Sequence, residues 1–99
     1  MSALSAEKLA DYLHEYSVYL EYWSPDEGDS HEMLGAREIL GKNAGRLTSA
    51  EAEELARLDR KAIRLMQTYR GRDTWDVKML RETARLAHEH LTSREASAA

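Results

Sequence analysis

Helix-breaking residues are few in this chain, and their positions divide it into four segments. Proline occurs once, at position 25, and the five glycines lie at positions 28, 35, 41, 45 and 71. Within the segments apolar residues recur every three or four residues, the period of an amphipathic helix, and no segment alternates as a strand does. The pattern predicts an all-α fold. We expect residues 1–99 to form a single domain, a small antiparallel bundle of three long helices and one short helix.

The bounds of the predicted helices follow from capping residues and from the breakers. The strongest start signal is Thr48 with Glu51 three residues later, which is the spacing of a capping box. The expected N-caps of the other helices are Ser5, Asp29 and either Asp73 or Thr74. We expect helices at about residues 5–23, 30–40, 48–69 and 74–91. The tail, residues 92–99, has little apolar surface to bury and is expected to be frayed.

Five of the seven aromatic residues lie in the first predicted helix. At about 100° per residue, one continuous stripe is formed by Tyr12, Tyr16, Tyr19 and Trp23. Such rings pack at the edge of a core with their polar tips in water, and they are also common in protein–protein interfaces. On the opposite side of the helix, Val18 and Tyr22 are expected to be exposed, which favours an interface.

The fourth predicted helix has more apolar surface than one core requires. Its main face is formed by Val77, Leu80, Ala84, Ala87 and Leu91. A second stripe, about 120° from Leu80 on a helical wheel, is formed by Trp75, Met79 and Leu86. Either the short second helix covers this stripe or another subunit does. The aromatic stripe and this second stripe are therefore the two candidate interfaces.

These surfaces predict a small non-enzymatic domain that acts by protein–protein contact or as a regulator, and that forms a homodimer. No chemical step and no cofactor are implied. No apolar run reaches the roughly 18–20 residues of a membrane span, so we expect no membrane association. Cysteine is absent, and the first residues lack the basic-then-apolar order of a secretory signal, so the expected location is cytoplasmic.

An uneven distribution of charge suggests the main alternative function. Residues 1–40 hold nine acidic and two basic side chains, whereas residues 41–99 hold nine acidic and twelve basic ones. One face of the predicted third helix carries a candidate anion-binding set, Arg57, Arg60, Lys61 and Arg64. This face would suit nucleic acid or another polyanion. The chain is acidic overall, however, and cations are also favoured toward helix C-termini by the macrodipole, so a solvated face is the first expectation.

Two acidic pairs suggest a second alternative, a metal-dependent enzyme. Glu51-x-x-Glu54 is followed by Asp73-x-x-Asp76. These pairs resemble the EExxE and ExxD motifs of all-α nucleoside triphosphate pyrophosphohydrolases of the MazG kind, which hold magnesium between helices. The resemblance covers only these positions, and Asp73 stands where the motif has Glu. In an antiparallel hairpin the two pairs would lie roughly 20 Å apart, too far to share one cation, so we do not assign this family.

The other polar candidates are Asp59 and the histidines. Asp59 lies on the flank of the apolar arc of the third helix, and a buried carboxylate requires a partner. A tyrosine hydroxyl, Arg37 or a cation of the fourth helix would supply it, so we expect a structural role. The histidines are His14, His31, His88 and His90. No two of them have the i,i+4 spacing of a helix-borne metal site, so we predict neither metal ligands nor catalytic residues.

Overall fold

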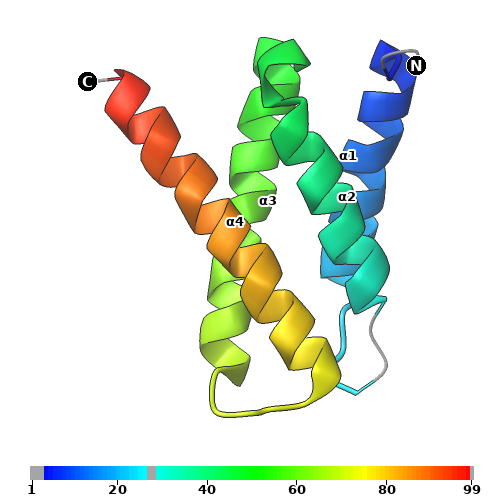
Figure 1. Ribbon diagram of the computed structural model, residues 1–99, viewed down its shortest axis with the longest axis vertical. Coiled ribbons are helices and arrows are strands. Elements are labelled where there is room, and N and C mark those ends of the chain that lie inside the picture. The colour runs from blue at the N-terminus through cyan, green and yellow to red at the C-terminus, as the bar shows by residue number, and fades with distance from the viewer. Residues whose placement is uncertain (1–3, 27–28, 99) are drawn as a thin grey trace.

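The structure, a computed structural model, describes residues 4–26 and 29–98, and this part of the chain is almost entirely helical (Figure 1). The helices are α1 (Ala6–Glu21), α2 (Ser30–Lys42), α3 (Ser49–Tyr69) and α4 (Trp75–Ala98), with a short 3₁₀ helix η1 (Ala44–Arg46) between α2 and α3. No strand occurs in the described residues. The predicted all-α fold is confirmed.

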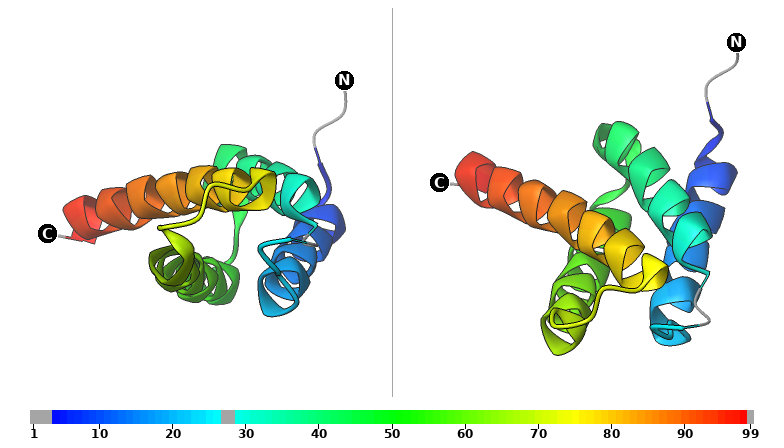
Figure 2. Two further views of the ribbon diagram at one scale, coloured as in Figure 1. Left: turned by 90° about the horizontal axis from the view of Figure 1, so that it is seen from below. Right: turned by 60° about the horizontal axis from the view of Figure 1, so that its bottom comes forward.

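Consecutive helices run in roughly opposite directions and are joined by short connections (Figure 1). Two layers are visible in the view from below, with α2 and α4 in one and α1 and α3 in the other (Figure 2, left). α4 crosses α2 obliquely, and its C-terminal half extends away from α1 and α2 (Figure 1). In the described part of the chain, none of the helices has both the length and the apolar character needed to cross a bilayer.

The capping box at the start of α3 forms as predicted. The Thr48 hydroxyl accepts a hydrogen bond from the Glu51 amide at 3.1 Å, and the Glu51 carboxylate accepts one from the Thr48 amide at 2.9 Å. Ser5 caps α1 by accepting from the Lys8 amide at 3.1 Å. Each cap satisfies amides that the first helical turn leaves unpaired, so these starts are set locally.

The starts of α2 and α4 differ in how their caps are made. The Thr74 hydroxyl accepts from the Val77 amide at 3.2 Å, which selects Thr74 over Asp73 as the cap of α4. Thr74 also donates to the Pro25 carbonyl at 2.8 Å and so ties the α1–α2 loop to α4. Asp29 occupies the N-cap of α2, but within the described residues its side chain makes no capping hydrogen bond. Glu27 and Gly28 of this loop lie outside the described residues.

α4 continues to Ala98, past its predicted end at about residue 91. The fraying of residues 92–99 stays a prediction. Residues 92–98 contain no glycine or proline to stop the helix. Arg94 adds a tertiary contact by donating to the Ala52 carbonyl of α3 at 3.1 Å. A polar hydrogen bond thus holds a segment that has little apolar surface, and only Ala99 of the predicted tail lies outside the described residues.

The core forms where the four helices meet. Its buried members are Leu13, Tyr16 and Leu20 of α1, Met33, Ala36 and Leu40 of α2, Leu55, Leu58 and Ala62 of α3, and Leu80 and Ala87 of α4. On the predicted main face of α4, Leu91 is half-buried and the other four residues are buried. Every helix therefore contributes one apolar stripe to a shared interior, as ridge-into-groove packing requires.

Candidate functional site

The second apolar stripe of α4 is covered in part by α2, which packs against it in the same layer. Met79 and Leu86 are half-buried. Trp75 remains 57% exposed, and its ring stacks on that of His31 at the start of α2, with 6.4 Å between ring centroids. The short helix thus covers most of this stripe, and the open apolar surface is concentrated at Trp75.

The aromatic stripe of α1 is largely enclosed by the chain itself. Tyr16 is 0% exposed, so we remove it from the candidate interface. Tyr12, Tyr19 and Trp23 are half-buried against the core. The Trp23 ring also packs on Tyr69 of α3, with 5.1 Å between centroids. Helical spacing identified residues that share a face, but the aromatic face turned inward.

Exposed apolar residues on α1 lie on the other side of the helix, as predicted. Val18 is 37% exposed and Tyr22 is 79% exposed. Both line a shallow groove between α1 and α3, which also includes Lys61. The ammonium of Lys61 lies 2.7 Å from the carboxylate of Glu21 across this groove. The hydrogen bond from Lys61 lowers the pKa of Glu21.

The basic face of α3 is partly neutralised. Besides the pair that Lys61 forms, Arg57 forms an ion pair with Glu54 of the same helix, and its hydrogen bond lowers the pKa of Glu54. Neither Arg60 nor Arg64 forms an ion pair with the described residues. Two of the four predicted anion-binding cations are therefore already paired within the chain, which reduces the positive potential of this face.

The two acidic pairs lie at opposite ends of the α3–α4 hairpin. Arg94 of α4 donates to the Glu53 carboxylate of α3 at 2.6 Å, which places the last turns of α4 beside Glu51 and Glu54. Asp76 precedes Arg94 by eighteen residues in α4, about 27 Å along the helix axis. The hairpin therefore keeps the pairs apart, as expected. Among the described residues, no three His, Asp or Glu side chains form a group that could hold a metal ion.

Asp59 is the centre of a buried polar network that joins three helices. Its Oδ1 accepts from the Tyr16 hydroxyl of α1 at 2.9 Å and from Nε of Arg37 of α2 at 2.8 Å, and its Oδ2 accepts from Nη2 of Arg37 at 3.0 Å. Arg37 is 1% exposed and Asp59 is 0% exposed. Two of the three expected partners of Asp59 are thus present, and the expected hydrogen bond and ion pair are confirmed.

The electrostatics of this network are dominated by burial. Burial raises the pKa of the Asp59 carboxyl, while the charge and hydrogen bonds of Arg37 and the bond from Tyr16 oppose that rise. Burial, with the adjacent negative charge of Asp59, raises the pKa of the Tyr16 hydroxyl well above its usual value. Tyr16 therefore remains a proton donor at every physiological pH. These bonds link α1, α2 and α3 in the interior of the bundle.

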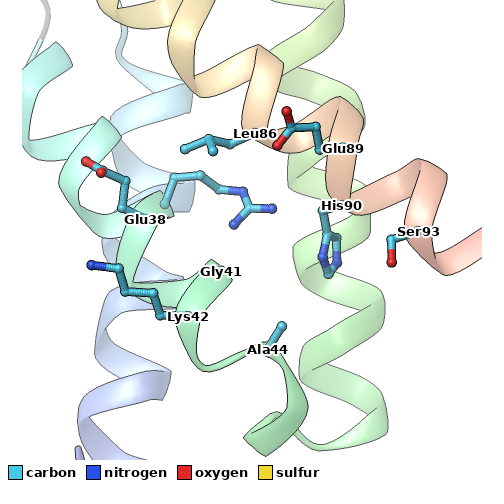
Figure 3. A pocket seen from close by; sticks show the side chains of 9 residues that line it. Glu38, Gly41, Lys42, Ala44, Leu86, Glu89, His90 and Ser93 are labelled. Carbon is cyan, nitrogen blue, oxygen red and sulfur yellow. The ribbon is translucent and has the colours of Figure 1, made fainter.

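Arg37 also lines a cleft of about 500 Å³ between α2, η1 and the C-terminal half of α4. Figure 3 shows Gly41 and Lys42 on the α2 side, His90 and Ser93 on the α4 side, and Leu86 and Ala44 at the two ends. The volume is in the range of small-molecule sites, about 300–1,000 Å³.

From the sequence, Arg37 was predicted only as a partner for Asp59, and the cleft was not predicted. A signal for the burial of Arg37 was present, since it follows Met33 by four residues and precedes Leu40 by three, which places it on the apolar arc of α2. The cleft itself had no signal, because it forms only where α4 diverges from α2.

His90 is the second unusual polar residue of this cleft. Its Nε2 is enclosed, and no hydrogen-bond partner lies near it in the described part of the chain. Burial lowers the pKa of His90, the charge of Asp59 opposes that effect, and the charges of Arg37 and Arg94 add to it. His90 is therefore neutral near pH 7.

Comparison of the chain with protein-family models, with curated proteins and with solved structures gives no match. Two places depart from the pattern of a simple closed bundle, the exposed ring of Trp75 and the cleft beside Arg37 and His90.

Proposed function

We propose that this chain is a non-enzymatic interaction domain that forms a homodimer through a surface around Trp75. The Trp75 surface consists of the stacked rings of Trp75 and His31 with three charged residues that neighbour them along the chain, Asp29, Glu32 and Lys78. The exposed fraction of Trp75, 57%, is the observation that supports this function. Tryptophan is among the residues that dominate the binding energy of interfaces, and an open indole in a small domain gains by being covered.

The arrangement of charge around Trp75 favours a second copy as the partner. Asp29 and Glu32 lie at the start of α2 and are exposed, while the exposed Lys78 lies one turn after Trp75 in α4. None of these three side chains forms an ion pair within the described residues. A two-fold contact brings the start of α2 in one copy against α4 in the other, and each copy does so reciprocally. Such a contact would bury both rings and pair opposite charges at its rim.

The test is the solution mass of the native chain and of Trp75→Ser, measured by light scattering. The native chain is expected at about twice its mass of 11.3 kDa. Loss of an interface tryptophan weakens binding by at least about 2 kcal/mol, roughly thirtyfold in Kd, so Trp75→Ser should be monomeric. The matched control is Tyr22→Ser, which removes the other highly exposed ring and should leave the dimer intact. A monomeric native chain, or a dimeric Trp75→Ser, would contradict the proposal.

A charge reversal tests the two-fold orientation. Lys78→Glu should weaken the dimer, since it places like charges opposite Glu32 of the other copy. Adding Glu32→Lys to the same chain should restore the affinity, because every reversed charge then meets a reversed partner. If the double variant is weaker than either single variant, the two copies do not meet in this orientation.

Polyanion binding by the face of Arg57, Arg60, Lys61 and Arg64 is the alternative function. It has less support, because Arg57 and Lys61 are paired within the chain. Nucleic-acid binding would weaken steeply with added salt, whereas burial of rings would change little. We also propose a cytoplasmic location for the interaction domain, as expected from the absence of cysteine.

A further inference from the structure

Two of the three guanidinium nitrogens of Arg37 donate hydrogen bonds to Asp59, and the third, Nη1, does not. Asp59 accepts from Nε at 2.8 Å and from Nη2 at 3.0 Å, and Tyr16 holds Asp59 in turn. Within residues 4–26 and 29–98, Nη1 donates no hydrogen bond. The side chain is 1% exposed and lines the cleft between α2, η1 and α4. A fixed guanidinium with an unused N–H group is preorganised to bind a planar anion.

Gly41 leaves this nitrogen uncovered. A Cβ at position 41 would lie 3.1 Å from Nη1 of Arg37, closer than ordinary van der Waals contact. Gly41 is helical and has no positive φ, so its backbone does not require glycine. Its role is spatial, because the missing side chain leaves room beside Nη1 at the wall of the cleft.

His90 supplies a second unsatisfied group on the opposite wall (Figure 3). Its Nε2 is enclosed without a partner in the described part of the chain. An unpaired nitrogen in such a place costs free energy. The ring as a whole is half-buried and lines the cleft, so a ligand there would bond to Nε2 after the ring has turned.

We propose that this cleft binds a small organic monocarboxylate, whose oxygens accept hydrogen bonds from Nη1 of Arg37 and from Nε2 of His90. The apolar part of the ligand would lie against Leu86, which lines one end of the cleft. This site is separate from the Trp75 surface and does not depend on dimer formation.

The charge of the lining disfavours a ligand with more than one negative charge. Arg37 is already neutralised by Asp59. Glu38 and Glu89 also line the cleft, against one further cation, Lys42. A phosphate or nucleotide would bring two or more charges toward these carboxylates, whereas a carboxylate brings one. The charge of the lining therefore favours a monocarboxylate over a phosphate.

Binding should depend on pH through His90. The charged groups that surround His90 are Arg37 of α2, Asp59 of α3 and Arg94 of α4, with Glu38, Lys42 and Glu89 around the cleft. A bound carboxylate favours the imidazolium form, so binding takes up a proton. The affinity should rise roughly fivefold or more as the pH falls from about 7.5 to about 5.5.

The experiment is a titration of the full chain with butyrate, followed by amide chemical shifts in NMR. We expect a Kd on the order of 1 mM for so small a ligand, with the largest shifts at Gly41, Ala44 and His90. Butyramide, the neutral isostere, should bind much more weakly. The proposal is overturned if butyrate moves no cleft amide at about 50 mM, well above that Kd, if butyramide binds equally well, or if inorganic phosphate binds more tightly.

Two alanine variants in α2 test the Arg37 contact, and urea unfolding of each variant checks that it folds. Gly41→Ala places a methyl group against Nη1 of Arg37 and should weaken butyrate binding about tenfold, the loss of one charge-assisted hydrogen bond. Gly35→Ala is the matched control, because a Cβ there meets nothing within 4 Å. Both changes favour the helix. Equal butyrate affinity in the two variants would rule out the Arg37 contact.

His90→Gln tests the other contact. This variant should bind butyrate with little pH dependence, and an unchanged pH profile would rule out the His90 contact.

Discussion

Two sets of three hydrogen-bonded side chains hold this bundle together, one at its centre and one at its end. The central network joins Tyr16, Asp59 and Arg37, and the end network joins Trp23, Ser30 and Asp76. Each network links α2 to α1 or its following loop and to one later helix. In the end network, Trp23 Nε1 donates to Ser30 Oγ at 2.9 Å, and Ser30 donates to Asp76 at 2.7 Å.

The central network has three hydrogen bonds and the end network has two, but the larger difference between them is their access to water. Arg37 and Asp59 are 1% and 0% exposed. At the end of the bundle Ser30 is buried, but Trp23 and Asp76 are only half-buried. Water can therefore replace a lost partner at the end, whereas a lost partner at the centre leaves a charge in the interior. Similar hydrogen bonds should thus differ several-fold in their contribution to stability.

The largest expected effect comes from removing the central carboxylate. Asp59→Ala leaves the Arg37 guanidinium buried without a counter-charge and should lower the free energy of unfolding by about 3–5 kcal/mol. Asp76→Ala, the matched change in the end network, should cost about 1 kcal/mol. Urea unfolding followed by circular dichroism measures both. Equal losses in the two variants would show that solvent access does not distinguish the networks.

Removing one hydroxyl from each network should give a smaller difference in the free energy of unfolding, again with the larger loss at the centre. Tyr16→Phe removes a bond to a buried carboxylate and should cost about 2 kcal/mol. Ser30→Ala removes two bonds, yet it should cost about 1 kcal/mol, because the half-buried Trp23 and Asp76 can bind water instead. Both values come from the same urea experiment. A larger loss for Ser30→Ala than for Tyr16→Phe would contradict the comparison.

The smallest effect is a dependence of stability on pH, and it concerns His90, which feels the charges of Asp59 and Arg37. The pKa of His90 is lowered in the folded state, so the unfolded chain binds more protons once the pH falls below about 6.5. His90 therefore contributes stability at neutral pH that is lost as the pH falls through its folded pKa. Burial raises the pKa of Asp59, which gives the opposite slope at lower pH.

The difference between the native chain and His90→Gln isolates the contribution of His90. Between about pH 7 and pH 5 the native chain should lose stability relative to this variant, by less than about 1 kcal/mol because the ring is half-buried. Melting temperatures across this range measure the difference. Parallel curves for the two chains would show that His90 does not titrate differently on folding.

Helix positions could be read from the sequence because their signals are local. The capping box of Thr48 and Glu51 and the breakers near residues 25 and 71 act within a few residues of themselves. The end of α4 could not be read in this way. Arg94 reaches a carbonyl that lies forty-two residues earlier in the chain, and no local pattern records that contact.

The candidate sites were less predictable than the helices. The α1 stripe and the second α4 stripe were found by spacing, yet spacing does not say what covers a face. Tyr16 turned out to be buried against Asp59, whereas Trp75 stayed largely open. The cleft had no signal at all, since it arises from the angle at which α4 leaves α2.

The sequence by itself determined that the chain forms four helices, where three of them begin, and which side chains share each face, because helix formation depends on neighbours within about one turn. Only the tertiary structure decided which of those faces are covered and how Arg37, Asp59 and His90 come together. These outcomes depend on the crossing of helices, which is set by packing between residues distant in sequence.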